Sequence, residues 1–180
     1  MNNKKFAVIG VSGRGSGMAL ELQNVEGVEV AAICDLYADR VEDTQKRFQE
    51  EHGFIPDGYT DYKELLKRED ICAVMVATTW ITHSRIAVDC MEAGKHVAME
   101  VGGAASAEEC WQLVRTSERQ VSSVCFLKTA VMTALKWLFT ICPVRAFSAK
   151  SYIHRVRIST TFVTKLPWAE KTATADFSTL

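Results

Sequence analysis

The stretch FAVIGVSGRGSG, residues 6–17, decides the fold. Its apolar start predicts a buried strand, and the glycines that follow mark a tight turn into a helix. A turn of this kind brings backbone N–H groups against a pyrophosphate, where side chains would block the approach and the helix N-terminus carries partial positive charge. Gly10, Ser12 and Gly15 occupy the three positions of the dinucleotide-binding fingerprint, with serine in place of the middle glycine.

An acidic residue stands where this fingerprint requires one. Asp35 follows the predicted strand 28–34, and it lies 20 residues after Gly15. A carboxylate at this place accepts hydrogen bonds from the ribose hydroxyls of the adenosine half, and its charge repels a 2′-phosphate. We therefore predict a site for NAD rather than NADP. The alternative is a glycine turn that only starts a helix, with Asp35 as a solvated neighbour.

The remainder of residues 1–127 alternates short apolar runs with helical periods, the pattern of β-α-β units. A helix with Met18, Leu22 and Val25 on one face is expected to end at Gly27. The other strands are expected at 6–10, 71–77, 96–100 and 121–127, and the other helices at 40–51, 61–64, 82–93 and 106–118. The predicted fold is α/β, a doubly wound parallel sheet (Rossmann fold).

Composition excludes several classes of protein. With 180 residues, 48% hydrophobic and 24% charged, the chain is typical of an ordinary globular domain. No apolar run approaches the roughly 18 residues of a membrane span, and residues 1–5 lead straight into a strand, so we expect neither a membrane partner nor a signal peptide. The six cysteines stand singly and are predicted to be reduced and buried, with no metal site. The expected location is cytoplasmic.

The charge is divided unevenly along the chain. Residues 1–127 hold 13 Lys and Arg against 20 Asp and Glu, a net −7, whereas residues 128–180 hold 8 against 2, a net +6. All ten glycines lie in the first part. We therefore divide the chain into a dinucleotide-binding domain, 1–127, and a tail, 128–180. A basic arm for nucleic acid is one explanation, but the basic residues of the tail are dispersed, so no nucleic-acid partner is expected.

Four segments resemble a known family. They are residues 10–17, 32–35, 77–79 and 91–100, and together they make residues 4–127 similar to the glucose-fructose oxidoreductase and inositol dehydrogenase family (Gfo/Idh/MocA). Dehydrogenases of this family follow the last glutamate with Lys-Pro, and the lysine acts as acid/base. Here the sequence reads Glu100-Val101-Gly102. This departure, with Trp80-Ile81-Thr82-His83, resembles the glycoside hydrolase family 109 branch, which has Glu-Val-Pro.

The resemblance implies a cofactor and a chemistry. Enzymes of that branch keep NAD bound and cleave α-N-acetylgalactosaminides: C3 is oxidised, the C2 proton becomes acidic, the aglycone is eliminated, water adds, and the hydride returns. Glycine in place of proline at residue 102 predicts a less rigid loop. Without the resemblance, Trp80 would be a half-buried aromatic at a strand end, His83 a residue at a helix start and Glu100 a charge at a strand end. The residues expected at the cofactor are Gly10, Ser12, Gly13, Arg14, Gly15, Asp35, Thr78, Trp80, Ile81, Thr82, His83, Glu100 and Val101.

The tail departs from the family after Leu127. Restoring one base near that codon allows residues 128–133 to be decoded as Glu-Asn-Cys-Cys-Tyr-Asp, a phrase of family 109, and later segments decode likewise. We therefore interpret residues 128–180 as out of frame, with a non-native helix expected at 130–142. The α+β substrate domain is then missing from this truncated chain, so we expect exposed apolar surface, aggregation and no glycosidase turnover. Only the intact parent would take a carbohydrate substrate.

Two other functions stay open at this point. One is an NAD-dependent sugar or polyol dehydrogenase of the same family, which Val101 at the lysine position disfavours. The other is a non-enzymatic NAD-binding protein with a basic tail that contacts nucleic acid.

Overall fold

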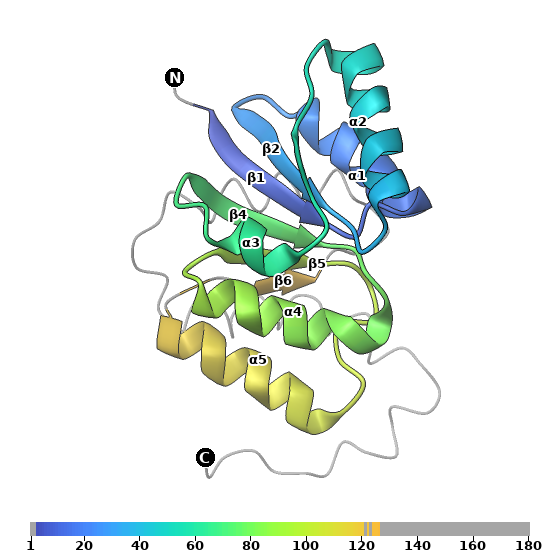
Figure 1. Ribbon diagram of the computed structural model, residues 1–180. Helices are drawn as coiled ribbons and strands as arrows, with labels where there is room; N and C mark the ends of the chain where they lie inside the picture. The colour runs from blue at the N-terminus through green and yellow to red at the C-terminus, as the bar shows by residue number, and fades with distance from the viewer. Residues whose placement is uncertain (1–2, 121, 123, 127–180) are drawn as a thin grey trace, which may run out of the picture. The chain divides into compact units, whose positions relative to one another are not determined.

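The computed structural model describes residues 3–120, 122 and 124–126. They form a single parallel sheet of six strands with the order β3-β2-β1-β4-β5-β6, and helices connect the strands (Figure 1). The elements are β1 (Lys4–Ile9), α1 (Gly13–Gln23), β2 (Val28–Cys34), α2 (Ala38–His52), β3 (Asp57–Tyr59), α3 (Tyr62–Leu66), β4 (Ile71–Val76), α4 (Trp80–Glu92), β5 (His96–Met99), α5 (Ala107–Gln120) and β6 (Val124–Phe126). The predicted doubly wound α/β fold is confirmed.

The strand order reverses between β1 and β4, and this reversal places the site. The chain winds outward in one direction through β2 and β3, then crosses back to β4 and winds outward in the other direction. The connections after β1 and β4 therefore separate at the carboxyl edge of the sheet, where open α/β sheets bind their ligands.

The core lies on both faces of β1 because helices cover both faces of the sheet. Ala7 and Ile9 belong to a cluster with Leu65 of α3, Ile86 of α4 and Leu113 of α5. The alternate residues of β1 are also buried, and α1 and α2 contact the part of the sheet formed by β1, β2 and β3. Burial on both sides explains why the strands have continuous apolar sequences rather than alternating ones.

Helix ends were mostly predictable from their caps. Gly53 ends α2 with φ +77°, as expected. Asp61 accepts a hydrogen bond from Lys63 N at the start of α3. In α5, Ser106 Oγ accepts from Glu109 N at 3.2 Å, which confirms the predicted cap. Each of these contacts satisfies a backbone group that the first or last turn leaves unpaired.

Three expectations need correction or fall outside the structure. Helix α1 ends at Gln23 with Asn24 as its cap, so Val25 is not helical, and Gly27 instead turns the chain into β2 with φ +80°. The three-residue strand β3 was not predicted, because it is short and contains Gly58. The expected helix at 130–142 and the whole tail 128–180 lie outside the described residues.

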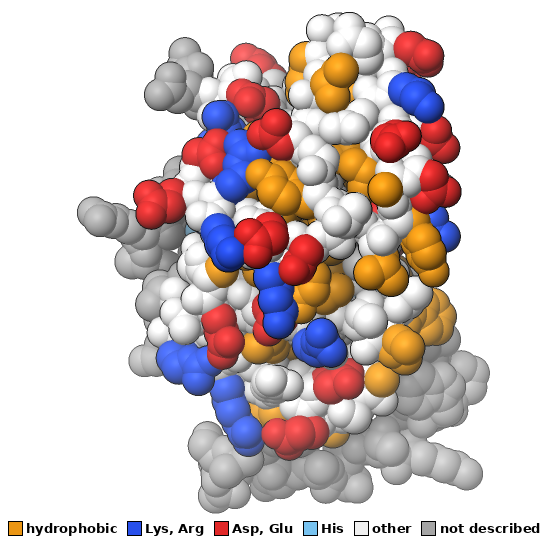
Figure 2. Space-filling model, in the orientation of Figure 1, with side chains coloured by type: hydrophobic (Ala, Val, Ile, Leu, Met, Phe, Trp, Pro, Cys, Tyr) orange, Lys and Arg blue, Asp and Glu red, His pale blue; other side chains and the backbone are white. Residues whose placement is uncertain are grey.

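The face of the described part seen in Figure 2 has charges of both signs interspersed with apolar side chains. No described helix is long and apolar enough to cross a bilayer, and no cluster of three potential metal-ligating side chains occurs among these residues. Cys34 and Cys90 are buried, and burial raises the pKa of the Cys34 thiol to about 12. Cys110 corrects the expectation of buried cysteines: it is exposed because α5 buries only Leu113 and Thr116.

Candidate dinucleotide-binding site

The glycine turn is held by close packing between β1, α1 and the end of β4. Gly10 has φ +91°, and a Cβ atom there would lie 2.7 Å from the backbone of Ala77. A Cβ atom on Gly15 would lie 1.9 Å from the carbonyl oxygen of Gly10. The first and third fingerprint glycines are therefore required by the fold itself. Gly13 has open space where a Cβ atom would point.

The N-terminus of α1 faces this open space without a cap. Ser12 precedes the helix in extended conformation, its side chain makes no capping hydrogen bond, and the first turn holds no acidic residue. An uncapped helix N-terminus presents backbone donors and partial positive charge. This is the chemistry that binds a pyrophosphate.

Asp35 supports the glycine turn from the end of β2. Its side chain is nearly buried, and Oδ2 accepts a hydrogen bond from Val11 N at 2.9 Å. Its Oδ1 accepts from Tyr37 N at 3.2 Å and lies 3.4 Å from Nη1 of Arg40, whose guanidinium stacks on the Tyr37 ring at 4.4 Å. Oδ1 thus accepts from two donors, whereas Oδ2 keeps a second lone pair, so binding the turn leaves capacity for a ribose hydroxyl.

His83 fixes the connection between β4 and α4. It is 1% exposed, and its Nε2 lies 3.0 Å from the carbonyl oxygen of Thr78, so this nitrogen carries the proton and donates. Burial lowers the pKa of His83, opposed by the Thr78 carbonyl, by Glu100 and by the backbone of Gly102. The ring is therefore neutral at neutral pH, and its buried Nδ1 has no hydrogen-bond partner within the described chain.

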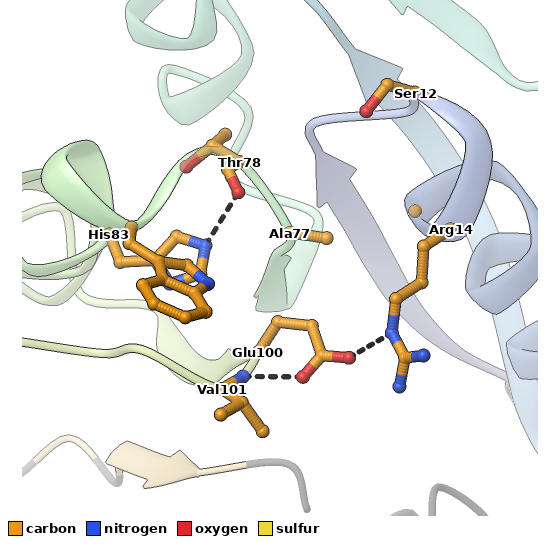
Figure 3. A pocket seen from close by; sticks show the side chains of 9 residues that line it. Ser12, Arg14, Ala77, Thr78, His83, Glu100 and Val101 are labelled. Atoms are coloured by element: carbon orange, nitrogen blue, oxygen red, sulfur yellow. Dashed lines mark hydrogen bonds and ion pairs between the residues drawn. The ribbon is translucent and has the colours of Figure 1, made fainter. Parts of the chain in front are cut away.

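An ion pair joins the two sides of the site. Glu100, at the end of β5, pairs with Nε of Arg14 in the first turn of α1 and also accepts from Val101 N (Figure 3). Glu100 is nearly buried, whereas the Arg14 side chain is 55% exposed. The pair compensates a carboxylate that burial alone would disfavour.

These residues surround a pocket of about 430 Å³ at the carboxyl edge of the sheet. Eight of the predicted residues line it, together with Ala77, which was not predicted as a site residue: they are Ser12, Arg14, Gly15, Thr78, Trp80, His83, Glu100 and Val101. Ala77 directly follows β4, so its position at a strand end was the available signal. Five predicted residues do not line the pocket: Gly10, Gly13, Asp35, Ile81 and Thr82.

The residues outside the pocket differ in what they do. Gly10 and Asp35 shape the glycine turn. Thr82, in the first turn of α4, has its Oγ1 2.9 Å from Thr78 Oγ1 and also donates to the carbonyl oxygen of Thr79. Ile81 is 79% exposed and points away from the core. Trp80 is 68% exposed at the start of α4, so the interpretation of a half-buried aromatic at a strand end is wrong.

The glycine turn, Asp35 and the pocket at the carboxyl edge of the sheet are together typical of a dinucleotide-binding α/β domain. The model of the oxidoreductase family Gfo/Idh/MocA, described as an NAD-binding Rossmann fold, matches residues 4–126. Because this covers more than half of the chain, the chain belongs to that family. NAD is accordingly the cofactor that its fold accommodates.

The similar curated proteins are glycosidases by name. An alpha-N-acetylgalactosaminidase of Bacteroides fragilis is 41% identical over 118 residues, which are 64% of this chain and 28% of that protein. A glycosyl hydrolase family 109 protein of Solibacter usitatus is 40% identical over 121 residues, 63% of this chain and 27% of that protein. The chain thus spans little more than a quarter of the relatives it matches.

Several solved structures with the same fold contain a bound dinucleotide. GenD2 from gentamicin A biosynthesis, in complex with NAD, superimposes with a TM-score of 0.64 at 23% identity, covering 70% of this chain and 34% of that one. A 3-ketoreductase mutant from Actinomadura kijaniata, in complex with TDP-benzene and NADP, gives 0.60 at 27% identity, covering 69% and 37%. The predicted fold and family are confirmed.

Proposed function

We propose that residues 4–126 form the NAD-binding part of a glycosidase that acts on α-N-acetylgalactosaminides, and that the 180-residue chain binds NAD without turning over such substrates. The observation that carries the proposal is the pocket between the uncapped N-terminus of α1 and the first turn of α4, with Glu100 and Val101 in its wall. Bound NAD supplies a reversible hydride acceptor. The family 109 relatives support the substrate class.

The pocket composition favours the glycosidase over a dehydrogenase. Val101 occupies the position after Glu100 where the dehydrogenase pattern has lysine, and no lysine lines the described pocket. Lys95, at the opposite end of β5, is nearly buried and donates from Nζ to the carbonyl oxygen of Arg68 at 2.6 Å. It is therefore committed to the amino edge of the sheet and does not replace the missing acid/base.

The first test is binding of NAD by the whole chain, measured by titration calorimetry. Asp35→Ala removes an acceptor of the buried Val11 N–H and the expected ribose ligand. We expect it to weaken NAD binding by about tenfold or more. Asp39→Ala, an exposed acid in the first turn of α2, is the matched control and should leave the affinity unchanged. Wild-type chain without affinity for NAD, or an affinity that Asp35→Ala leaves intact, contradicts the proposal.

The second test separates binding from turnover. An aryl α-N-acetylgalactosaminide is offered to NAD-loaded chain, and release of the aryl alcohol is followed by absorbance. We expect none, because general acid and base groups must be positioned on the sugar and the described pocket residues face the dinucleotide site. A robust rate at enzyme concentrations that exclude contamination refutes the inactive assignment while retaining the substrate class.

Two finer points belong to the same proposal. Preference for NAD over NADP rests on the negative charge of Asp35. The cytoplasmic location is supported by four free thiols, those of Cys34, Cys72, Cys90 and Cys110.

The rival function is a basic tail that contacts nucleic acid. It predicts salt-dependent binding of nucleic acid that is lost when residues 128–180 are deleted. A fluorescently labelled duplex distinguishes the two, since our proposal expects no such binding.

A further inference from the structure

Gly102 lies three residues after the end of β5 and two after Glu100, and its backbone conformation and surroundings suit glycine. Its φ is +92°, and a Cβ atom there would lie 2.5 to 2.7 Å from Cγ, Cδ1 and Cδ2 of Trp80. These three atoms are the base of the indole and not a flexible end. With the backbone in this conformation, a side chain at residue 102 would therefore displace the ring of Trp80.

The backbone of Gly102 also lies close to His83, which lines the pocket from the same helix turn as Trp80. Trp80 and His83 are three residues apart in α4, so they lie on neighbouring positions of its first turn, and both line the pocket. The backbone of Gly102 is close enough to His83 to favour the protonated ring. One glycine thus contacts the tryptophan and influences the histidine that form this side of the pocket.

The place of Trp80 in the site indicates which part of a dinucleotide it meets. Asp35, at the end of β2, is the expected partner of the adenosine ribose, and the N-terminus of α1 is the expected partner of the pyrophosphate. Trp80 and Val101 lie on the other side of the switch point, after β4 and β5. The half of the ligand that remains for them is the nicotinamide nucleotide.

We propose that Gly102 is a positioning residue: it seats the indole of Trp80 so that the tryptophan packs against the nicotinamide ring, and this contact favours the oxidised form of the cofactor. The inference rests on the proposed function. The oxidised ring carries a positive charge, whereas the reduced ring is neutral. An exposed indole attracts a flat cation through its electron-rich face. The carboxylate of Glu100 in the same pocket is paired with Arg14, so the preference rests on the indole and not on a net charge of this pair.

The test compares the full chain with Gly102→Ala, Trp80→Ala and the double variant. Gly94→Ala is the matched control, because Gly94 also has positive φ, +76°, but nothing lies within 4 Å of a Cβ atom there. Affinities for NAD⁺ and NADH are measured by calorimetry. We expect Gly102→Ala to weaken NAD⁺ binding about fivefold and NADH binding less, with the affinity of Gly94→Ala unchanged.

The double variant decides whether Gly102 acts through Trp80. If it does, Trp80→Ala with Gly102→Ala binds NAD⁺ no more weakly than Trp80→Ala alone. A second readout uses a chain in which Trp111, Trp137 and Trp168 are phenylalanine: NAD⁺ should quench the remaining Trp80 emission, and Gly102→Ala should remove most of the quenching.

The outcomes separate this inference from the proposed function. Wild-type chain that fails to bind either form overturns both. Wild-type binding with Gly102→Ala equal to Gly94→Ala overturns only the role of Gly102. An equal loss of affinity for NAD⁺ and NADH overturns the preference for the oxidised form. A further loss in the double variant overturns the route through Trp80.

Discussion

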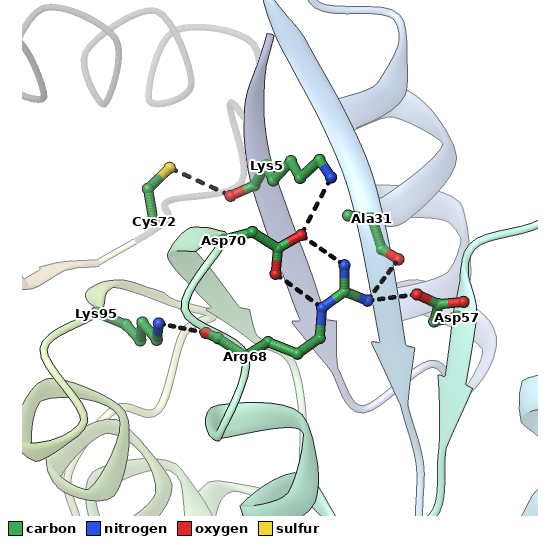
Figure 4. Close-up of polar contacts among 7 residues, drawn as sticks. All are labelled: Lys5, Ala31, Asp57, Arg68, Asp70, Cys72 and Lys95. Atoms are coloured by element: carbon green, nitrogen blue, oxygen red, sulfur yellow. Dashed lines mark hydrogen bonds and ion pairs between the residues drawn. The ribbon is translucent and has the colours of Figure 1, made fainter. Parts of the chain in front are cut away.

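The two edges of the sheet use charged residues for opposite purposes. At the amino edge, Arg68 makes a bidentate pair with Asp70, contacts Asp57 and the carbonyl oxygen of Ala31, and so joins the connections around β2, β3 and β4 (Figure 4). Lys5 of β1 completes this group at 3.1 Å from Asp70. At the carboxyl edge, helix N-termini stay uncapped and a pocket opens.

The two edges differ in how many polar groups they leave available to a ligand. The amino edge satisfies its charges internally, so it holds strands together and offers little to a ligand. The carboxyl edge contains the glycine turn, the exposed indole of Trp80 and the nearly buried carboxylate of Glu100. These groups leave apolar surface and hydrogen-bonding capacity available to a ligand. The next three predictions test this division, from the largest effect to the smallest.

Gly15→Ala should be the most damaging single change at the carboxyl edge. The added Cβ atom collides with the Gly10 carbonyl oxygen, a backbone atom that cannot move independently. We expect a loss of about 3 kcal/mol in the free energy of unfolding, measured by urea denaturation. Gly17→Ala is the control in the same helix, because nothing lies within 4 Å of its Cβ position, and it should gain about 0.5 kcal/mol. Equal effects would show that the packing of the turn is not the cause.

Arg68→Met tests the amino edge. It keeps the apolar stem but removes the contacts with Asp70, Asp57 and Ala31. Since the Arg68 side chain is only 20% exposed, we expect a loss of about 1–2 kcal/mol in unfolding free energy, with unchanged affinity for NAD. Lys67→Met, which breaks a largely exposed pair with Glu64, should cost under about 0.5 kcal/mol. A change in NAD affinity for Arg68→Met would contradict the division between the edges.

Acid should lower the stability of the fold in two steps. The Arg68 guanidinium, with Lys5, holds the pKa of Asp70 well below its usual range, so its contribution is complete above pH ~4 and is lost as the pH falls further. Burial lowers the pKa of His83, so the native state resists its protonation and stability declines once the pH falls below ~6.5. Burial and Lys4 also lower the pKa of His96 at the amino edge, so both edges contribute to the upper step, whereas the lower step belongs to the amino edge alone.

Unfolding free energies between pH 3 and 8 measure these two steps. Asp70→Asn should flatten the lower step and His83→Gln part of the upper one. The lower step should be smaller in Arg68→Met as well, because that variant lacks the larger of the two charges that lower the Asp70 pKa and keeps only Lys5. A profile of Asp70→Asn identical to that of the wild type would refute the assignment.

The sequence predicted the parts of the molecule whose cause is local. Glycines at fixed spacing, capping residues such as Asp61 and Ser106, and Asp35 after an apolar run each act within a few residues or within one β-α-β unit. Strand β3 was missed because three residues containing a glycine carry no periodicity, and only pairing with β2 makes them a strand.

Contacts between distant segments were not predictable in the same way. The pair between Arg14 and Glu100 joins positions 86 residues apart, and the contact between Gly102 and Trp80 joins two different crossover connections. The sequence placed three of these four residues at the cofactor but could not state that they contact one another. For Gly102 it predicted only a looser loop, whereas the structure shows the glycine packed against an aromatic ring.

The link between Arg14 and Glu100 makes the entrance of the site sensitive to ionic strength. This ion pair connects the segment after β1 with the segment after β5, and more than half of the Arg14 side chain is exposed to solvent. At 1 M ionic strength the Debye length is about 3 Å, so concentrated salt should weaken the attraction between the exposed Arg14 guanidinium and Glu100. The segments after β1 and β5 should then be held together less tightly.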